Sequence, residues 1–341
     1  MRYVNIPHTN LSPSVICLGT ADMGGKMSRE TAFAVLDAYV AAGGTFLDTA
    51  KVYSDWIPGE RSRSEKLLGE WLRERGNRSQ IILATKGAHP DLLHMDTPRL
   101  APADIVSDIE ASLKHLQTDV IDLYWLHRDD PARPVDEILD TLNAQIKAGR
   151  IRYFACSNWR TARIQSAQAY AKASGCMGFV ANQMLWNAAV MDPLGQPDKT
   201  LAAMDNAMHA LHVETQLAAV PYSSQANGLF SKLQKPLAAR IQRDPKRLLL
   251  QVARHVRNVV YAQQALYPRG PNSQQLVVIL DIAAARGFTV SQVVLGYLLS
   301  QPFPVFPIVG CQNLGQLEDS LRAADALLSE DEIAQLDVLR R

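Results

Sequence analysis

The stretch VIDLYWLHRDDPARPVDEILDTLNAQIKAG (residues 120–149) holds a short apolar run followed by a longer helical pattern. The run VIDLYWL (120–126) is continuous, as in strands that are buried on both faces of a parallel sheet. After it, Ile138, Leu142 and Ile146 recur at helical spacing, and Gly149 closes the segment. One strand followed by one helix is the repeating unit of α/β folds.

Similar apolar runs recur along the chain, with helical patterns between them. The eight expected strands are VICLG (15–19), TFLD (45–48), IILAT (81–85), VIDLYWL (120–126), RYFAC (152–156), FVANQ (179–183), QLAAV (216–220) and VFPIV (305–309). Eight such units favour a closed (β/α)8 TIM barrel over an open doubly wound sheet. No GxGxxG follows the first run, which argues against a Rossmann fold. We therefore expect a single α/β barrel domain over residues 1–341.

Two segments fall outside this repeat. Residues 1–14 are expected to form a small hairpin across the floor of the barrel. Residues 225–275 form a long excursion after the seventh strand, and loops of this length are often functional. A solvated helix face is the interpretation we favour for its basic residues, which are Arg240, Arg243, Lys246, Arg247, Arg254 and Arg257.

Composition excludes several classes of partner. The 35 basic and 34 acidic residues leave a net charge of +1, so no bulk attraction to nucleic acid or to a membrane surface follows. The opening MRYVNIPHTN lacks the apolar core of a signal peptide, and no apolar run approaches the ~20 residues of a membrane span. These features predict a cytoplasmic protein. Buried thiols, and not disulfides or a zinc site, are expected for Cys17, Cys156, Cys176 and Cys311, since none are in CxxC spacing.

Four reactive side chains follow three successive strands. Asp48 ends the second strand and Tyr53 follows in its loop, while Lys86 and His127 follow the third and fourth strands. Barrel enzymes place their chemistry at this end of the strands. Taken singly, an Asp cap, a packed Tyr or a hydrogen-bonded His would each be ordinary. A lysine at the end of a core strand, however, needs a partner or a task, and Asp48 offers the opposite charge.

In combination these residues indicate proton transfer to a carbonyl oxygen. A tyrosine has an ordinary pKa near 10, and a nearby ammonium group favours the phenolate and lowers that pKa. Asp48 would keep Lys86 charged, and His127 would hydrogen-bond the substrate oxygen. A metal-dependent barrel hydrolase is the weaker alternative, because no HxH follows the first strand and His89 and His94 are isolated in a loop.

The segments DTAKVY (48–53), ATKG (84–87) and DLYWLHRDDP (122–131) resemble the catalytic segments of the aldo-keto reductase family, in order and in spacing. PYSSQANGLF (221–230) and PIVGCQNLGQLEDS (307–320) resemble further segments of the family, and the resemblance covers about residues 11–328. It implies that Ser157, Asn158 and Gln183 hold the nicotinamide carboxamide and that Tyr222 stacks on the ring. The implied cofactor-binding set is Gly19, Thr20, Asp48, Ser157, Asn158, Gln183, Tyr222, Ser223, Gln225, Asn227, Gly310, Gln312, Gln316 and Asp319.

By this resemblance the chain is an NAD(P)-dependent oxidoreductase that reduces an aldehyde or ketone to an alcohol, or catalyses the reverse, with Tyr53 as general acid or base. A redox-sensing regulatory subunit of the same fold, with little turnover, is the alternative. The family usually holds a 2′-phosphate with Arg or Lys, but the segment 310–319 has no basic residue. In the loop after the seventh strand, Asn227 occupies a position where a basic residue is common in the family. NADP(H) is slightly favoured by family habit, and NAD(H) stays open.

The expected partner is a small carbonyl or alcohol compound. Trp56, Trp125, Trp159 and Trp186 fall at or after strand ends, and flat aromatic faces suit cyclic substrates. We therefore expect these tryptophans to rim the mouth of the barrel around a carbohydrate-like or cyclic carbonyl compound, with some of the four belonging to the core instead. Neither an oligomeric state nor the direction of the reaction is predicted.

Overall fold

The computed structural model describes residues 1–196, 198–234 and 265–338. Its strands form one parallel sheet in the order β7-β6-β5-β4-β3-β2-β1-β8. They are β1 (Cys17–Gly19), β2 (Phe46–Asp48), β3 (Ile82–Gly87), β4 (Ile121–Leu126), β5 (Ile151–Ser157), β6 (Ala181–Gln183), β7 (Ala218–Ala219) and β8 (Ile308–Val309). Each lies within or beside one of the eight predicted runs, so all eight predicted strands are confirmed.

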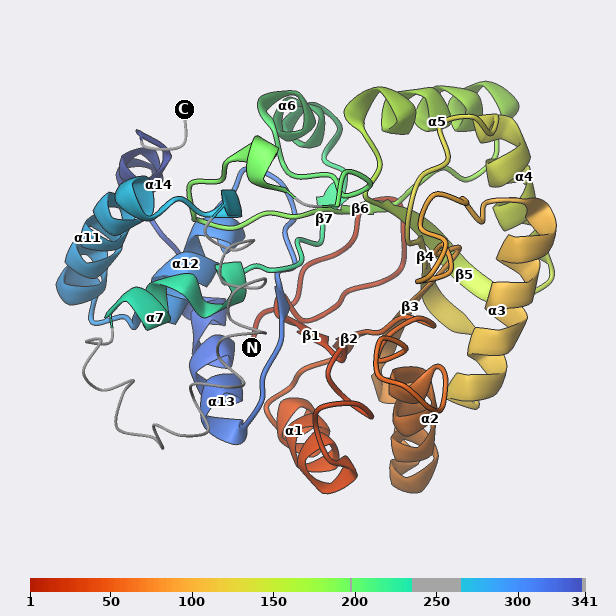
Figure 1. The fold of residues 1–341 in the computed structure, drawn as a ribbon, viewed down its shortest axis with the longest axis horizontal. Coiled ribbons are helices and arrows are strands. Elements are labelled where there is room, and N and C mark those ends of the chain that lie inside the picture. Colours follow the sequence, from red (N-terminus) through yellow and green to blue (C-terminus); the bar gives the residue numbers. More distant parts are fainter. Residues whose placement is uncertain (197, 235–264, 339–341) are drawn as a thin grey trace.

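The sheet closes between its two end strands. Ala219 of β7 donates its backbone N–H to Pro304 O at 2.9 Å, and Phe306 N donates back to Ala219 O at 2.8 Å. A further bond, from Ile308 N to Pro221 O at 3.0 Å, reaches into β8. The strands therefore form a barrel with the helices outside it, as Figure 1 shows. The predicted TIM barrel is confirmed.

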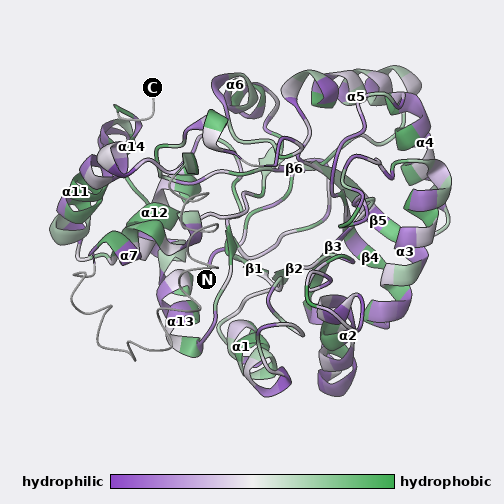
Figure 2. Cartoon of the chain, viewed as in Figure 1, coloured by the Kyte–Doolittle hydropathy of each residue, from purple (hydrophilic) through white to green (hydrophobic). Residues whose placement is uncertain are grey.

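The helices start and stop where local chemistry favours it. Ser28 caps α1 by accepting from Thr31 N, and Pro102 occupies the first turn of α3, where its missing N–H costs nothing. Figure 2 shows hydrophilic residues on the outward faces of the peripheral helices. The helices are α1 (Arg29–Ala41), α2 (Arg63–Arg75), α3 (Pro102–Leu116), α4 (Val135–Lys147), α5 (Thr161–Ser174), α6 (Asn206–Thr215), α7 (Leu229–Gln234), α11 (Arg269–Arg286), α12 (Val290–Leu299), α13 (Leu314–Arg322) and α14 (Glu330–Asp337).

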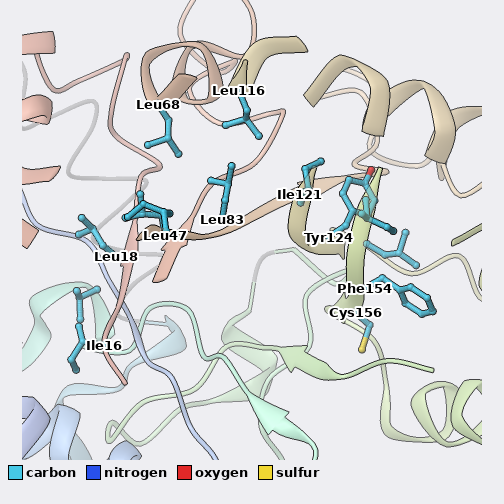
Figure 3. Packing of buried hydrophobic residues seen from close by; sticks show 14 of the residues in the cluster. Ile16, Leu18, Leu47, Leu68, Leu83, Leu116, Ile121, Tyr124, Phe154 and Cys156 are labelled. Carbon is cyan, nitrogen blue, oxygen red and sulfur yellow. The ribbon is translucent and has the colours of Figure 1, made fainter. Parts of the chain in front are cut away.

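The largest core lies between the strands and the surrounding helices. Leu18, Leu47 and Leu83 come from three neighbouring strands and lie close to Leu68 of α2 and Leu116 of α3 (Figure 3). All five side chains are fully buried. Burial of one such side chain contributes roughly 1.5–3 kcal/mol, so this layer fixes the strand ends that carry the site.

The N-terminal segment forms the predicted hairpin. Tyr3 and Ser14 form an antiparallel bridge, and Ile6 N donates to Leu11 O at 2.9 Å. Ile6 is fully buried in a cluster with Phe46 and Phe306, so the hairpin packs against the interior of the barrel. The described part of the excursion after β7 contains α7 and the start of α11. Its predicted basic residues, 240 to 257, lie outside the described residues.

All four cysteines are free thiols; Cys17, Cys156 and Cys311 are buried, and Cys176 is half-buried. In the part of the chain that the structure describes, no single helix is long and apolar enough to cross a membrane.

A buried histidine in α6 makes stability depend on pH. His212 is fully buried; its Nδ1 lies 2.6 Å from Leu217 O, and Asn182 Nδ2 lies 3.3 Å from its Nε2. A carbonyl oxygen only accepts, so Nδ1 carries a hydrogen; the Asn182 Nδ2 group only donates, so Nε2 accepts and the ring is neutral. Burial lowers the pKa of His212 to about 4.

Because the unfolded chain takes up a proton near pH 6.5 and the folded chain does not, the stability from this site is present above pH 6.5 and is lost as the pH falls towards 4. Between pH 7.5 and pH 5, the unfolding free energy of His212→Gln should therefore fall by about 2 kcal/mol less than that of the unaltered protein. Urea unfolding of both proteins at the two pH values measures it. An equal loss in both proteins would contradict the prediction.

Candidate active site

The centre of the site is a buried ion pair between two neighbouring strands. Asp48 is the last residue of β2, and Lys86 is the fifth residue of β3. The Lys86 ammonium donates to Asp48 Oδ2 and, at 2.9 Å, to Thr49 O. Both side chains are almost completely buried. Burial alone would disfavour the charged lysine, but Asp48 and Tyr53 together raise the pKa of Lys86 above its ordinary value.

Tyr53 joins this pair through its hydroxyl group. Lys86 Nζ donates to Tyr53 Oη at 2.9 Å and lies 4.6 Å from the centroid of the ring. Burial raises the pKa of Tyr53, while Lys86 acts to lower it. The net direction is upward, so the expectation of a lowered pKa is wrong. The physical reason is that desolvation of the phenolate outweighs its attraction to the ammonium.

His127 is the first residue after β4, and its backbone N–H donates to Gly87 O at 2.9 Å. Its ring lies edge-on to Tyr53, with centroids 5.9 Å apart. Burial, helped by the positive charge of Arg128, lowers the pKa of His127 well below 6.5. The imidazole is therefore neutral. Its Nδ1 is buried and has no hydrogen-bond partner among the described residues.

The ends of β5 and β6 bring three polar residues to the same mouth. Asn158 donates from Nδ2 to Ser157 Oγ at 3.1 Å and from its backbone to Gln183 O at 3.0 Å. Gln183 donates to Asp48 Oδ1 at 3.1 Å, which links this group to the ion pair. Tyr222, after β7, donates from Oη to Asn158 Oδ1 at 2.8 Å. These residues thus lie next to the catalytic candidates, as the sequence predicts.

The remaining residues of the predicted cofactor set lie after β1, β7 and β8. Thr20, next to Gly19, donates to Asp48 O at 3.2 Å. Ser223, Gln225 and Asn227 lie in the segment after β7. Gly310 and Gln312 lie between β8 and α13, and Gln316 lies in the first turn of α13. The two segments touch where Gln225 Nε2 donates to Ser320 Oγ at 3.0 Å. The segments that follow β7 and β8 therefore lie next to each other.

Asp319 faces a different way. Its carboxylate accepts from Thr289 Oγ1 at 2.7 Å and from Gln292 Nε2 at 3.2 Å. Those two residues form the capping box at the start of α12. Asp319 therefore joins α13 to α12, and we leave it out of the residues that we propose for the cofactor.

The model of the aldo/keto reductase family matches residues 15–341. The chain belongs to the aldo/keto reductase family. This membership supports an oxidoreductase that acts on carbonyl compounds.

Two curated aldo/keto reductase relatives align with 97% of this chain. Norsolorinic acid reductase B from Dothistroma septosporum is 28% identical, and the match covers 79% of that protein. An aryl-alcohol dehydrogenase named for NADP(+), from Phanerodontia chrysosporium, is 27% identical, and the match covers 83% of it. A solved thermostable aldo-keto reductase in complex with the inhibitor epalrestat has a TM-score of 0.68 and 22% identity, covering 99% of this chain and 100% of that one. This structural likeness shows the shared fold.

The tryptophans of this aldo/keto reductase do not form the predicted rim. Trp56 is 47% exposed and lies 6.2 Å from the Tyr53 ring, between centroids. Trp125, Trp159 and Trp186 are at most 1% exposed. Trp159 packs on Phe179 and Trp186 on Phe303, with centroids 4.9 and 5.9 Å apart. The expectation of an exposed aromatic rim is wrong for these three, because their large apolar surfaces fill the core.

Two residues outside the four catalytic candidates lie near the site: His89, and Arg128, which the sequence offered either as a substrate contact or as a loop charge. His89 packs against His127, with ring centroids 4.7 Å apart, although the sequence suggested an isolated loop residue. Arg128 is buried, donates to His127 O at 2.9 Å and to Thr200 Oγ1 at 3.0 Å, and pairs with Asp198. The sequence could have identified His89 as a site residue, because it follows Lys86 closely at the end of the same strand. No group of three His, Cys, Asp or Glu residues is arranged to hold a metal ion within the described residues.

Proposed function

We propose that this aldo/keto reductase is an NAD(P)H-dependent enzyme that interconverts an aldehyde or ketone and its alcohol, with Tyr53 as the general acid and base. The buried chain of contacts from Asp48 through Lys86 to Tyr53 Oη carries the proposal. It provides a proton donor whose conjugate base is stabilised by a fixed positive charge. The natural substrate is a small carbonyl or alcohol compound, for which the site offers an apolar face at Trp56.

The donor set beside Tyr53 fits a nicotinamide. The Asn158 and Gln183 amides and the Ser157 hydroxyl are buried together and can donate to and accept from a carboxamide. Tyr222 offers a ring beside them. The edge formed by Ser223, Gln225, Asn227, Gly310, Gln312 and Gln316, with Gly19 and Thr20, would hold the rest of the dinucleotide. When bound, the nicotinamide supplies or accepts a hydride.

The chain's own residues handle the proton. In the reducing direction Tyr53 gives its phenolic proton to the carbonyl oxygen, and the Lys86 ammonium stabilises the phenolate that remains. The neutral His127 donates its N–H to the same oxygen and so orients the carbonyl group. Asp48 keeps Lys86 charged and in place. In the oxidising direction the same groups act in reverse, with Tyr53 as the base.

The test is turnover by the unaltered protein. A panel of aldehydes, ketones and sugar alcohols is assayed by nicotinamide absorbance with both cofactors. Turnover of one substrate class supports the proposal. If the protein binds NADPH or NADH but turns over none of the panel, the redox-sensing regulatory role takes its place.

Recognition of the 2′-phosphate is expected to be weak, with NADP(H) slightly preferred. Of residues 310 to 322, Arg322 is the one basic residue, and it is paired with Glu318 at 2.6 Å. The phosphate would depend on backbone N–H groups at the start of α13. We expect Gln312→Arg, which adds a cation at this exposed position, to tighten NADPH binding by about tenfold and to leave NADH binding unchanged. Fluorescence titration of both cofactors measures this. An equal gain for NADH would contradict it.

A further inference from the structure

We propose that Nε2 of His89 accepts a hydrogen bond from a hydroxyl group of the substrate, so that the enzyme favours aldehydes and ketones carrying a hydroxyl substituent. This inference rests on the proposed function, because it names the substrate class of the same site. His89 lies outside the four catalytic candidates, and the orientation and position of its ring carry the proposal.

The tautomer of His89 follows from its hydrogen bond. Nδ1 lies 2.7 Å from Pro90 O. A carbonyl oxygen can only accept, so Nδ1 carries a hydrogen, and in the neutral ring Nε2 keeps its lone pair. Burial, together with the positive charge of Arg128, lowers the pKa of His89 to about 4, so the ring stays neutral around pH 7. Nε2 of His89 therefore accepts hydrogen bonds and cannot donate one.

The ring is held rigidly beside the reaction centre. Its centroid lies 4.7 Å from that of His127, which in turn lies 5.9 Å from the Tyr53 ring. The preceding residue, Ala88, has a φ of 58°, in the left-handed region that favours glycine. That turn is fixed because Ala88 N donates to the buried Asp108 Oδ2 at 2.8 Å. An acceptor fixed in this way selects for a hydroxyl at a defined place on the substrate.

His89 also lines a cavity of about 490 Å³. Its other lining residues include the charged side chains of Arg61 and Asp91 and the apolar side chains of Val52 and Leu92, and neither Tyr53 nor His127 lines it. What brings the His89 acceptor to the reaction centre is therefore the contact between its ring and the ring of His127, with centroids 4.7 Å apart.

The decisive measurement is equilibrium binding, by calorimetry, of matched aromatic alcohols and aldehydes that bear either a hydroxyl or a methoxy group at the 3- or 4-position. A methoxy group keeps the oxygen but cannot donate. We expect the unaltered protein, saturated with cofactor, to bind one hydroxyl compound about tenfold more tightly than its methyl ether. His89→Phe keeps an aromatic ring against His127 and removes the acceptor, so the preference should disappear.

His89→Gln is the matched control, because its side-chain oxygen also accepts and should keep part of the preference. Equal binding of each hydroxyl compound and its ether by the unaltered protein would overturn the inference. A preference that survives in His89→Phe would overturn it too. Binding is measured without turnover, so a lack of reductase activity counts against the proposed function alone. With an active enzyme, the ratio of kcat/KM values for each pair should follow the binding ratio.

Discussion

Replacing Tyr53 with phenylalanine should lower kcat for carbonyl reduction by about a thousandfold or more, the upper part of the range for a general acid. The substitution removes only the hydroxyl, which accepts from Lys86 Nζ at 2.9 Å in the buried site. Without it the phenolic proton that the proposed mechanism transfers to the carbonyl oxygen is gone. Steady-state kinetics with the best substrate of the panel measures the loss, and cofactor titration should give a nearly unchanged Kd.

A matched control separates this chemistry from a general loss of phenolic hydroxyls. Tyr170 on α5 donates to Asp140 at 2.7 Å on an exposed face of the protein. Tyr170→Phe should therefore leave kcat and the cofactor Kd within about twofold of the starting values, as is usual for surface positions. If Tyr53→Phe also kept its activity, Tyr53 would not be the proton donor.

The barrel and the contact between Asp48 and Lys86 were predictable because both follow from strand periodicity. Parallel strands end on one side of a barrel, so polar residues at the ends of β2 and β3 must approach each other. A buried lysine moreover requires a nearby negative charge. Both features follow from position along the chain and from the cost of burying a charge.

Other features depend on packing that the chain order does not contain. The strand-end positions of Trp159 and Trp186 did not reveal that their rings pack on Phe179 and Phe303. Likewise, the carboxylate of Asp319 meets Thr289, which is 30 positions away, because α12 and α13 pack together. The pKa of Tyr53 depends on how fully the phenolate is desolvated, and only the folded structure shows that this exceeds the effect of Lys86.

We also expect substitutions of Asp48 and Lys86 to have strongly coupled effects on the free energy of unfolding. Lys86→Met leaves the buried Asp48 carboxylate without its cation, and breaking such a pair costs about 3–5 kcal/mol of unfolding free energy. Activity should disappear as well, because Tyr53 loses the charge that stabilises its phenolate. Urea unfolding measures the first effect and steady-state kinetics the second.

The double variant Asp48→Asn/Lys86→Met tests whether the cost comes from the unpaired charge. An asparagine keeps an oxygen that can accept from Gln183 Nε2, and a neutral pair leaves no buried charge. We therefore expect the double variant to be more stable than Lys86→Met by about 2 kcal/mol, while it remains inactive. Stability losses that simply add would show that Asp48 and Lys86 do not stabilise each other. Recovered activity in the double variant would mean that the fixed charge beside Tyr53 is not needed for proton transfer.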